Sequence, residues 1–223
     1  MSDNRNQEKP SIIRSISTLV KAARGEIIIP SKHLQLLVLN DSDPNIRAQA
    51  LIALCHQNKT FPTDVVLKLL NEDPSTHVRC AAALCLDGQT NNVAILSLIE
   101  RLQKDSDHHV RMYLLEALGH NISEDIGQLL LEMMNKDPSV MVRSVAAGLL
   151  FEGGGEEFLF KLSTSPNFCE RRAALRGLKH VKSSKIGPII TKMARNDPEF
   201  RIRKLATRLL HELNNPNRKK GNY

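Results

Sequence analysis

The sequence predicts an all-α fold, a right-handed solenoid of about six stacked helix pairs with a period of about 32 residues. Three observations support this prediction. A short motif with an acid and an arginine recurs along the chain, alanine and leucine follow each arginine at fixed distances, and the composition suits closely packed helices. The 223 residues are 41% hydrophobic with no Trp, so Leu, Ile, Val and Ala must form the core.

The recurring motif sets the register of the repeats. Its arginines are Arg47, Arg79, Arg111, Arg143, Arg171 and Arg203. Successive arginines are 32, 32, 32, 28 and 32 residues apart. Six positions before each arginine lies a polar residue that can accept hydrogen bonds. These residues are Asp41, Asp73, Asp105, Asp137, Ser165 and Asp197. We expect the acid, often followed by proline, to end the first helix of each pair and to cap the second.

Small and apolar residues follow each arginine at constant spacing. The third residue after the arginine is Ala50, Ala82, Leu114, Ala146, Ala174 or Ala206. The seventh is Leu54, Leu86, Leu118, Leu150, Leu178 or Leu210. Alanine allows neighbouring helices to approach closely, and leucine fills the space between layers. One helix pair cannot bury its apolar face alone, so the pairs must stack.

These residues resemble the HEAT-repeat family, whose units carry a turn Asp and a second-helix Arg at the same separation. The resemblance covers about residues 31–213. It implies antiparallel helix pairs, second helices that line a concave surface, and a ladder of Asp–Arg contacts between repeats. Because they recur, the repeat arginines could be functional, but we interpret them as structural hydrogen-bonding groups. The fifth unit departs from the pattern in its shorter length, in Ser165 and Glu170, and in the glycine run 153–155. We expect a tightened turn or a change of curvature there.

The motif also divides the chain into segments. We expect disordered tails over residues 1–10 and 214–223, and a solenoid over 11–213 that begins with a degenerate cap at 11–30. The predicted repeats cover about 31–58, 62–88, 93–120, 124–152, 156–181 and 185–213.

The sequence favours a protein without catalytic residues, cofactor or metal. It contains no GxSxG or HExxH motif, and FEGGGEEFLF lacks the features of a phosphate-binding loop. Its only His-Glu dipeptide is His211–Glu212. The chain therefore lacks the several His-Glu pairs by which deoxyhypusine hydroxylase, an enzyme with HEAT-type repeats, is recognised. An enzyme or lyase subunit of this fold stays a lesser alternative.

Cysteine and histidine fit the same interpretation. We interpret Cys55, Cys80, Cys85 and Cys169 as small buried residues in a reducing compartment, and the cytoplasm is the expected location. Neither an apolar run long enough to span a membrane nor a secretory signal is visible. His56, His120 and His180 each lie nine residues after a repeat arginine, where a cation near a helix end is favourable. For His108 and His109 we expect an exposed turn.

Charge distinguishes the two ends of the chain. Residues 1–162 carry 16 basic and 20 acidic residues, whereas residues 163–223 carry 15 and 4. The net charge therefore changes from −4 to +11 between these segments. Helical geometry places the first, fifth and eighth residues after each arginine on the side away from the stack. These positions are largely neutral or apolar in the first four units and basic in the last two.

This difference predicts a non-catalytic scaffold or adaptor that binds an acidic protein or peptide on its concave surface. The alternative is a solenoid that binds nucleic-acid phosphates through the same residues, and a solvated face that only aids solubility is the third reading. No membrane partner is expected. The predicted contact residues are Arg172, Arg176, Lys179, Lys185, Lys204 and Arg208.

Overall fold

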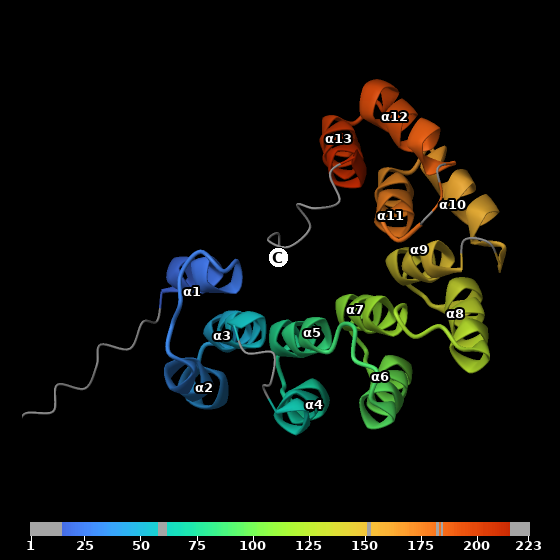
Figure 1. Ribbon diagram of the computed structural model, residues 1–223. Coiled ribbons are helices and arrows are strands. Elements are labelled where there is room, and N and C mark those ends of the chain that lie inside the picture. Colours follow the sequence, from blue (N-terminus) through green and yellow to red (C-terminus); the bar gives the residue numbers. More distant parts are fainter. Residues whose placement is uncertain (1–14, 58–61, 151–152, 182, 184, 215–223) are drawn as a thin grey trace, which may run out of the picture. The chain divides into compact units, whose positions relative to one another are not determined.

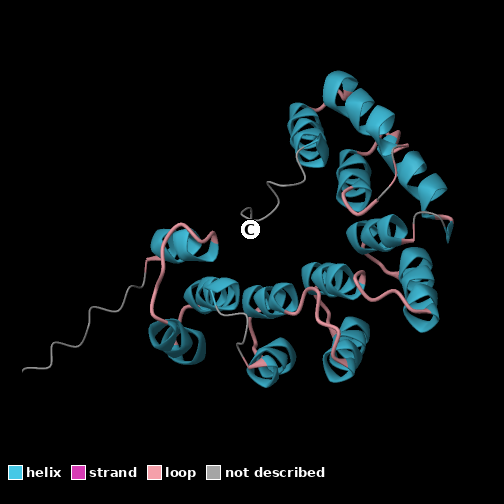
Figure 2. Cartoon of the chain, in the orientation of Figure 1, coloured by secondary structure: helices cyan, strands magenta, loops and turns pink. Residues whose placement is uncertain are grey.

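The computed structural model describes residues 15–57, 62–150, 153–181, 183 and 185–214. Within these ranges every regular element is a helix, as Figure 2 shows. The all-α prediction is therefore confirmed. The helices fall into two compact units, with α1–α5 in Met1–Cys85 and α6–α13 in Leu86–Lys220. The predicted disordered tails lie outside the described residues, except for Asn214, which ends the last helix.

The first unit contains five helices. They are α1 (Ile16–Ala23), α2 (Ser31–Asn40), α3 (Pro44–Gln57), α4 (Thr63–Glu72) and α5 (Thr76–Cys85). Two antiparallel pairs, α2–α3 and α4–α5, correspond to the first two repeats. Helices α1, α3 and α5 pack against one another in one layer, with α2 and α4 in the other (Figure 1). Helix α1 thus occupies the place of a second helix beside α3.

The second unit contains four helix pairs. Its helices are α6 (Asn92–Lys104), α7 (His108–Leu118), α8 (Glu124–Lys136), α9 (Val140–Leu149), α10 (Gly155–Ser163), α11 (Phe168–Leu178), α12 (Ile186–Asn196) and α13 (Phe200–Asn214). The second helices of the pairs, α7, α9, α11 and α13, form the inner layer of this unit in Figure 1. Helices α9 and α11 contact each other extensively, whereas α11 and α13 contact each other much less.

The turn within each pair is built by the recurring acid. The Asp137 carboxylate accepts a hydrogen bond from the amide of Ser139 at 2.8 Å, and Asp197 accepts one from Glu199 at 2.9 Å. Equivalent bonds occur at Asp41, Asp73 and Asp105. Each of these acids is the C-cap of the first helix, and the residue two positions later stands at the start of the second. The acid therefore stabilises the turn rather than capping the second helix directly, which refines the prediction.

The core confirms the apolar register. The six residues three positions after the arginines are fully buried. Of the six leucines at the seventh position, four are buried and two, Leu150 and Leu210, are half-buried. Each position buries apolar surface between repeats, which is the main source of stability in a stack of this kind.

Three repeat arginines, Arg47, Arg111 and Arg171, each bind the aspartate of the next repeat, as the ladder prediction requires. In Arg111, Nε and Nη2 donate to the two carboxylate oxygens of Asp137 at 2.8 and 2.9 Å. Its Nη1 donates to the Asp105 carbonyl oxygen of its own turn at 3.0 Å. Both side chains are buried, so the pair satisfies charges that would be costly to leave alone. These arginines are structural.

The fifth repeat differs through a close approach of helix backbones. Gly148 of α9 faces Gly177 of α11, and a Cβ added to Gly148 would meet the Gly177 carbonyl oxygen and lie 2.8 Å from its carbonyl carbon. The Ser144 hydroxyl donates to the Ala173 carbonyl oxygen at 2.5 Å. The glycine run begins α10, where Gly154 has a left-handed φ of 103°. Small residues thus bring α9 and α11 together.

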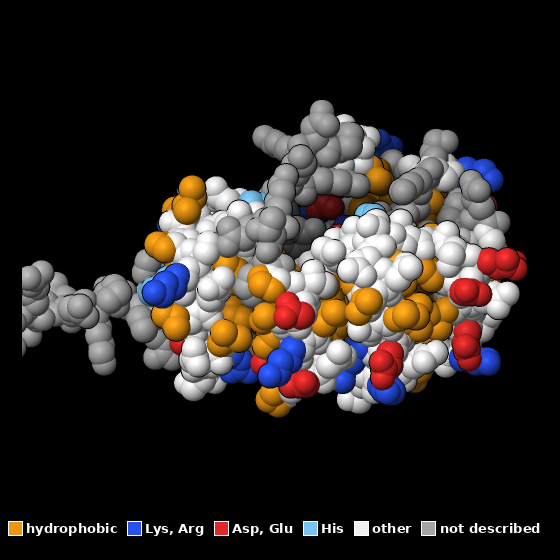
Figure 3. Space-filling model, turned by 60° about the horizontal axis from the view of Figure 1, so that its bottom comes forward, with side chains coloured by type: hydrophobic (Ala, Val, Ile, Leu, Met, Phe, Trp, Pro, Cys, Tyr) orange, Lys and Arg blue, Asp and Glu red, His pale blue; other side chains and the backbone are white. Residues whose placement is uncertain are grey.

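Exposed apolar residues of the described part of the chain occur mainly on the first helix of each pair. Leu36 and Leu39 on α2 and Val93 and Leu96 on α6 are more than half exposed. On the face drawn in Figure 3, hydrophobic side chains lie in small groups between charged ones. Such scattered groups are ordinary for a protein surface. No helix among the described residues is long and apolar enough to cross a membrane.

The cysteines differ from one another in burial. Cys55, Cys80 and Cys85 are half-buried thiols, whereas Cys169 is exposed, so the expectation of burial is wrong for Cys169. The Cys85 Sγ lies 3.7 Å from the Leu51 carbonyl oxygen. A hydrogen bond with Cys55, together with burial, raises the pKa of the Cys85 thiol well above its ordinary value. A raised pKa disfavours the thiolate, which is the reactive form of cysteine.

Candidate binding surface

Two inner helices of the second unit carry most of the predicted contact residues. On α11, Arg172 and Arg176 are four residues apart, and Lys179 follows as the C-cap. On α13, Lys204 and Arg208 repeat the first spacing. Residues separated by three or four positions share one face of a helix. The sequence therefore places a basic stripe on each of these two helices.

Four of these residues form an exposed set, which we call the basic surface: Arg172, Lys179, Lys204 and Arg208. Arg208 forms an ion pair within its own helix, with Nε 2.9 Å from Glu212 Oε1. The other three have no ion pair with any described residue. Exposed cations without internal partners are free to meet an anionic ligand.

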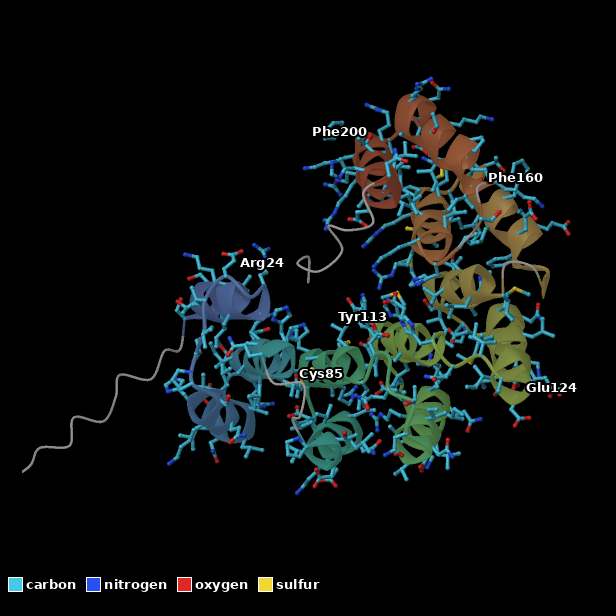
Figure 4. The ribbon with its side chains drawn as sticks, in the orientation of Figure 1. Arg24, Cys85, Tyr113, Glu124, Phe160 and Phe200 are labelled. Atoms are coloured by element: carbon cyan, nitrogen blue, oxygen red, sulfur yellow. The ribbon has the colours of Figure 1, made fainter. Side chains whose placement is uncertain are left out.

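Arg176 has a different role from the one predicted. Its Nη2 forms an ion pair with Glu116 Oε1 of α7, two repeats earlier, and its guanidinium carbon lies 5.4 Å from the centre of the Tyr113 ring. Figure 4 shows Tyr113 on α7. The Arg176 side chain is 24% exposed and that of Glu116 only 14%. Arg176 therefore connects α11 to α7 and is not part of the free basic surface.

The fourth repeat makes this long connection possible. Glu116 and Arg176 each occupy the fifth position after their repeat arginine, and the same position between them is Gly148. Since glycine has no side chain, the Arg176 side chain can pass over α9 to reach Glu116. The Gly148–Gly177 contact shortens the path further.

Histidines complete this ionic cluster. The His180 Nε2 lies 3.2 Å from Glu116 Oε1, and the His120 Nε2 lies 3.0 Å from Asp87 Oδ1. Burial raises the pKa of Glu116, but the combined effect of His180, Arg176 and Lys179 is larger and lowers it overall. Burial raises the pKa of Asp87, helped by Glu116 and opposed by His120. His120 and His180 thus contact acids from earlier repeats and do more than favour a helix end.

Lys185 lies apart from the other predicted contact residues. It is the N-cap of α12, a helix of the outer layer, and its ammonium group is 3.6 Å from Glu156 of α10. The two side chains are exposed, so this pair contributes little to stability. The structure does not bring Lys185 together with the basic surface.

The expected apolar half of the inner surface is largely filled by packing. At the first position after the arginine, Ala48, Met112 and Ser144 are buried. At the fifth position, Gly148 packs against Gly177. The prediction that these positions face away from the stack is therefore wrong in the fourth repeat, because α9 and α11 approach too closely to leave them open.

Three adjacent residues have donor atoms that could hold a metal ion. Asp107, His108 and His109 place one donor atom each within 4.8 Å of one another at the start of α7. The Asp107 carboxylate already accepts the His109 amide at 2.8 Å and caps the helix. His108 and His109 therefore begin α7 rather than lying in a loop, and their arrangement is accounted for by the helix start.

The fold and the ladder define a repeat protein, and the comparison with protein families agrees. The family model for HEAT repeats matches residues 31–119. The helix arginine continues to Arg203 beyond the matched part, and the turn acid continues too except in the fifth repeat, which has Ser165. Residues 31–119 are thus similar to HEAT repeats, and the remaining repeats share the same helix-pair plan. Such repeats generally form scaffolds and commonly mediate protein interactions. The search of curated proteins found no match.

Proposed function

We propose that this protein is a non-catalytic cytoplasmic scaffold or adaptor that binds an acidic protein or peptide through the basic surface. The observation that carries the proposal is the state of Arg172, Lys179 and Lys204, which are exposed on inner helices and form no ion pair with a described residue. Some other surface lysines, among them Lys104 and Lys136, are paired with glutamates of their own helices. Free cations gathered on two helices favour an anionic partner.

The basic surface is suited to steering as well as to contact. Residues 163–223 carry a net charge of +11, so an acidic partner is attracted over a distance set by the Debye length, about 8 Å at physiological salt. Arg172 presents a planar guanidinium that pairs bidentately with carboxylates, whereas Lys179 and Lys204 act as mobile point charges. A partner rich in Asp and Glu would use both kinds of contact.

Nucleic acid is the second candidate, because the same cations could bind phosphates. The two candidates differ in their dependence on aromatic residues and on salt. The chain has 4% aromatic residues and no Trp, so few side chains are available to stack on bases. This composition favours the protein partner.

A charge-reversal pair tests the proposal. The double variant Arg172→Glu/Lys204→Glu changes the basic surface, and Lys32→Glu/Lys68→Glu is a control with the same change of net charge on exposed residues of α2 and α4. Fluorescence anisotropy measures the affinity of each form for a labelled glutamate-rich peptide and for labelled duplex and single-stranded DNA at two salt concentrations.

We expect the control to bind the acidic peptide as the unchanged protein does, and the basic-surface variant to bind it at least about tenfold more weakly, a loss of about 1.4 kcal/mol. Tighter binding of DNA than of the peptide at physiological salt would favour the nucleic-acid candidate. Equal weakening in both double variants would show that net charge alone acts, and the proposed surface would be rejected.

A further inference from the structure

The Asp–Arg ladder has a gap at the fifth repeat. Arg47, Arg111 and Arg171 each use Nε and Nη2 to bind the carboxylate of the next repeat, at distances from 2.8 to 3.3 Å. The residue that should receive Arg143 is Ser165, which has no carboxylate. No described acid lies within ion-pair distance of Arg143.

Arg143 is nevertheless held as the other ladder arginines are. Its Nη1 donates to the Asp137 carbonyl oxygen at 2.7 Å and to the Pro138 carbonyl oxygen at 3.3 Å. Arg111 makes the same two bonds to its own turn, at 3.0 Å each. Because the same bonds hold Arg111 with its Nε–Nη2 edge toward the next repeat, we expect the Nε–Nη2 edge of Arg143 to face the next repeat as well. An anion that binds there need not immobilise the Arg143 side chain, which lowers the entropic cost of binding.

Ser165 performs only part of the role of the acid. Its Oγ accepts the Asn167 amide at 3.0 Å, as each ladder aspartate accepts the amide two residues later. The same hydroxyl donates to Glu170 Oε2 at 2.6 Å. Because this oxygen already accepts the Asn167 amide, it has one lone pair left and cannot accept from both nitrogens of a guanidinium edge, as a carboxylate does. The turn is therefore complete, but the ladder link from Arg143 to a carboxylate of the fifth repeat is missing.

We propose that Ser165 is a phosphorylation site and that its phosphate completes the ladder by pairing with Arg143. A kinase transfers the terminal phosphoryl group of a nucleoside triphosphate to Ser165 Oγ. The new O–P bond forms as the bond to the diphosphate breaks, and the hydroxyl proton passes to a base of the kinase. The phosphate carries a charge of about −1.5 to −2 and three acceptor oxygens, which suit a bidentate guanidinium contact.

The surroundings favour Ser165 over the neighbouring hydroxyl residues. Ser163 is buried, with its hydroxyl bonded to the Phe160 carbonyl oxygen at 2.7 Å. The Thr164 hydroxyl bonds carbonyl oxygens of the same helix, α10. Ser165 is half-exposed in the turn before α11. The surface cavity of about 570 Å³ that it lines is otherwise walled mainly by α10, α12 and the turn at Asp197, so this cavity lies on the side of the sixth repeat and does not include Arg143. Phe160, which also lines this cavity, marks its position on α10 in Figure 4.

Glu170 limits the stabilisation that a phosphate on Ser165 can give. Most repeats carry an isoleucine or valine at this position, immediately before the ladder arginine. A phosphate on Ser165 would lose the hydrogen bond to Glu170 and repel its carboxylate. The Glu170 side chain is half-exposed at the start of α11, so it can turn toward solvent. The Glu170→Val variant removes this repulsion and should increase the gain from phosphorylation.

The test compares four forms of the whole chain. Phosphoserine is placed at residue 165 by site-specific incorporation, with Arg143 intact or with Arg143→Gln, and each form is compared with its unmodified counterpart by thermal unfolding. We expect phosphorylation to raise the Tm by about 2–4 °C with Arg143 intact. In the Arg143→Gln background the rise should vanish or become a fall. A phosphorus NMR titration should show the second phosphate pKa below its usual value of about 6 only when Arg143 is present.

Two results would overturn the proposal. The first is an unchanged or lowered Tm with Arg143 intact, or an equal rise in both backgrounds, which would show that Arg143 does not hold the phosphate. The second comes from phosphopeptide mapping of the protein isolated from its own cells: phosphate absent from Ser165, or found on Ser163 or Thr164 instead, would reject the modification itself. Neither result bears on the basic surface, so this proposal and the proposed function can fail separately.

Discussion

Replacing Gly148 by alanine should destabilise the protein, although the same change usually stabilises a helix. Glycine inside a helix costs about 1 kcal/mol relative to alanine. At Gly148, however, the new Cβ would meet the carbonyl oxygen of Gly177 and lie 2.8 Å from its carbonyl carbon and 3.2 Å from its Cα. These are backbone atoms of α11, so the clash cannot be relieved by turning a side chain.

The size of the effect follows from these contacts. Helices α9 and α11 must separate until no atom of Gly177 lies within about 3.0 Å of the added carbon. This separation weakens the Ser144–Ala173 hydrogen bond, which is 2.5 Å long, and loosens buried residues between the two helices. Overpacking of this kind costs about 1–3 kcal/mol, and the weakened hydrogen bond adds about 1 kcal/mol. We therefore expect Gly148→Ala to lower the free energy of unfolding by about 1–3 kcal/mol, after the gain in helix propensity.

Two other helical glycines provide matched controls. A Cβ added to Gly127 of α8 or Gly187 of α12 would have no atom within 4 Å. Gly127→Ala and Gly187→Ala should therefore raise stability by up to about 1 kcal/mol. Urea denaturation followed by circular dichroism measures all three. A stabilising Gly148→Ala, equal to the controls, would refute the claim that α9 and α11 are held in backbone contact.

Two further predictions follow from the ladder and the ionic cluster. Arg171→Gln leaves the buried carboxylate of Asp197 without its cation and should cost about 3–5 kcal/mol in urea denaturation, whereas Arg143→Gln, which removes no carboxylate contact, should cost much less. Equal losses would contradict the ladder. Because the pKa of Glu116 is lower in the folded protein than its ordinary value of about 4.5, its contribution to stability is present above that value and is lost as the pH falls through the lower folded pKa. Glu116→Gln should therefore reduce stability at neutral pH and flatten its dependence on pH on the acid side, and an unchanged acid profile would contradict this role.

The fold could be predicted because the same residue types recur at the same positions in each repeat. The spacing of the arginines located all six helix pairs, and the positions of Ala50 and Leu54, counted from Arg47, located the core. These residues act through contacts with the same position in the next repeat. Once the register is known, a single sequence is sufficient to assign them.

The ionic cluster could not be predicted in the same way. Glu116 and Arg176 are 60 residues apart, and their contact depends on how closely α9 lets α7 and α11 approach. The signal available in the sequence was Gly148, at the same repeat position between an acid and a base. A helical wheel treats each repeat alone, so it assigned Arg176 to a free surface. Distances across two repeats depend on local curvature, which small residues set.

The basic surface can be tested most directly by lysine labelling. An amine-reactive reagent modifies exposed lysines, and mass spectrometry compares the extent of labelling with and without a saturating glutamate-rich peptide. Lys179 and Lys204 belong to the basic surface, while Lys32 and Lys68 are exposed on α2 and α4 and serve as internal references. We predict that the peptide slows labelling of Lys179 and Lys204 and leaves both references unchanged. Unchanged labelling at Lys179 and Lys204 in a bound complex, or equal protection of all four lysines, would contradict the proposed role of this surface.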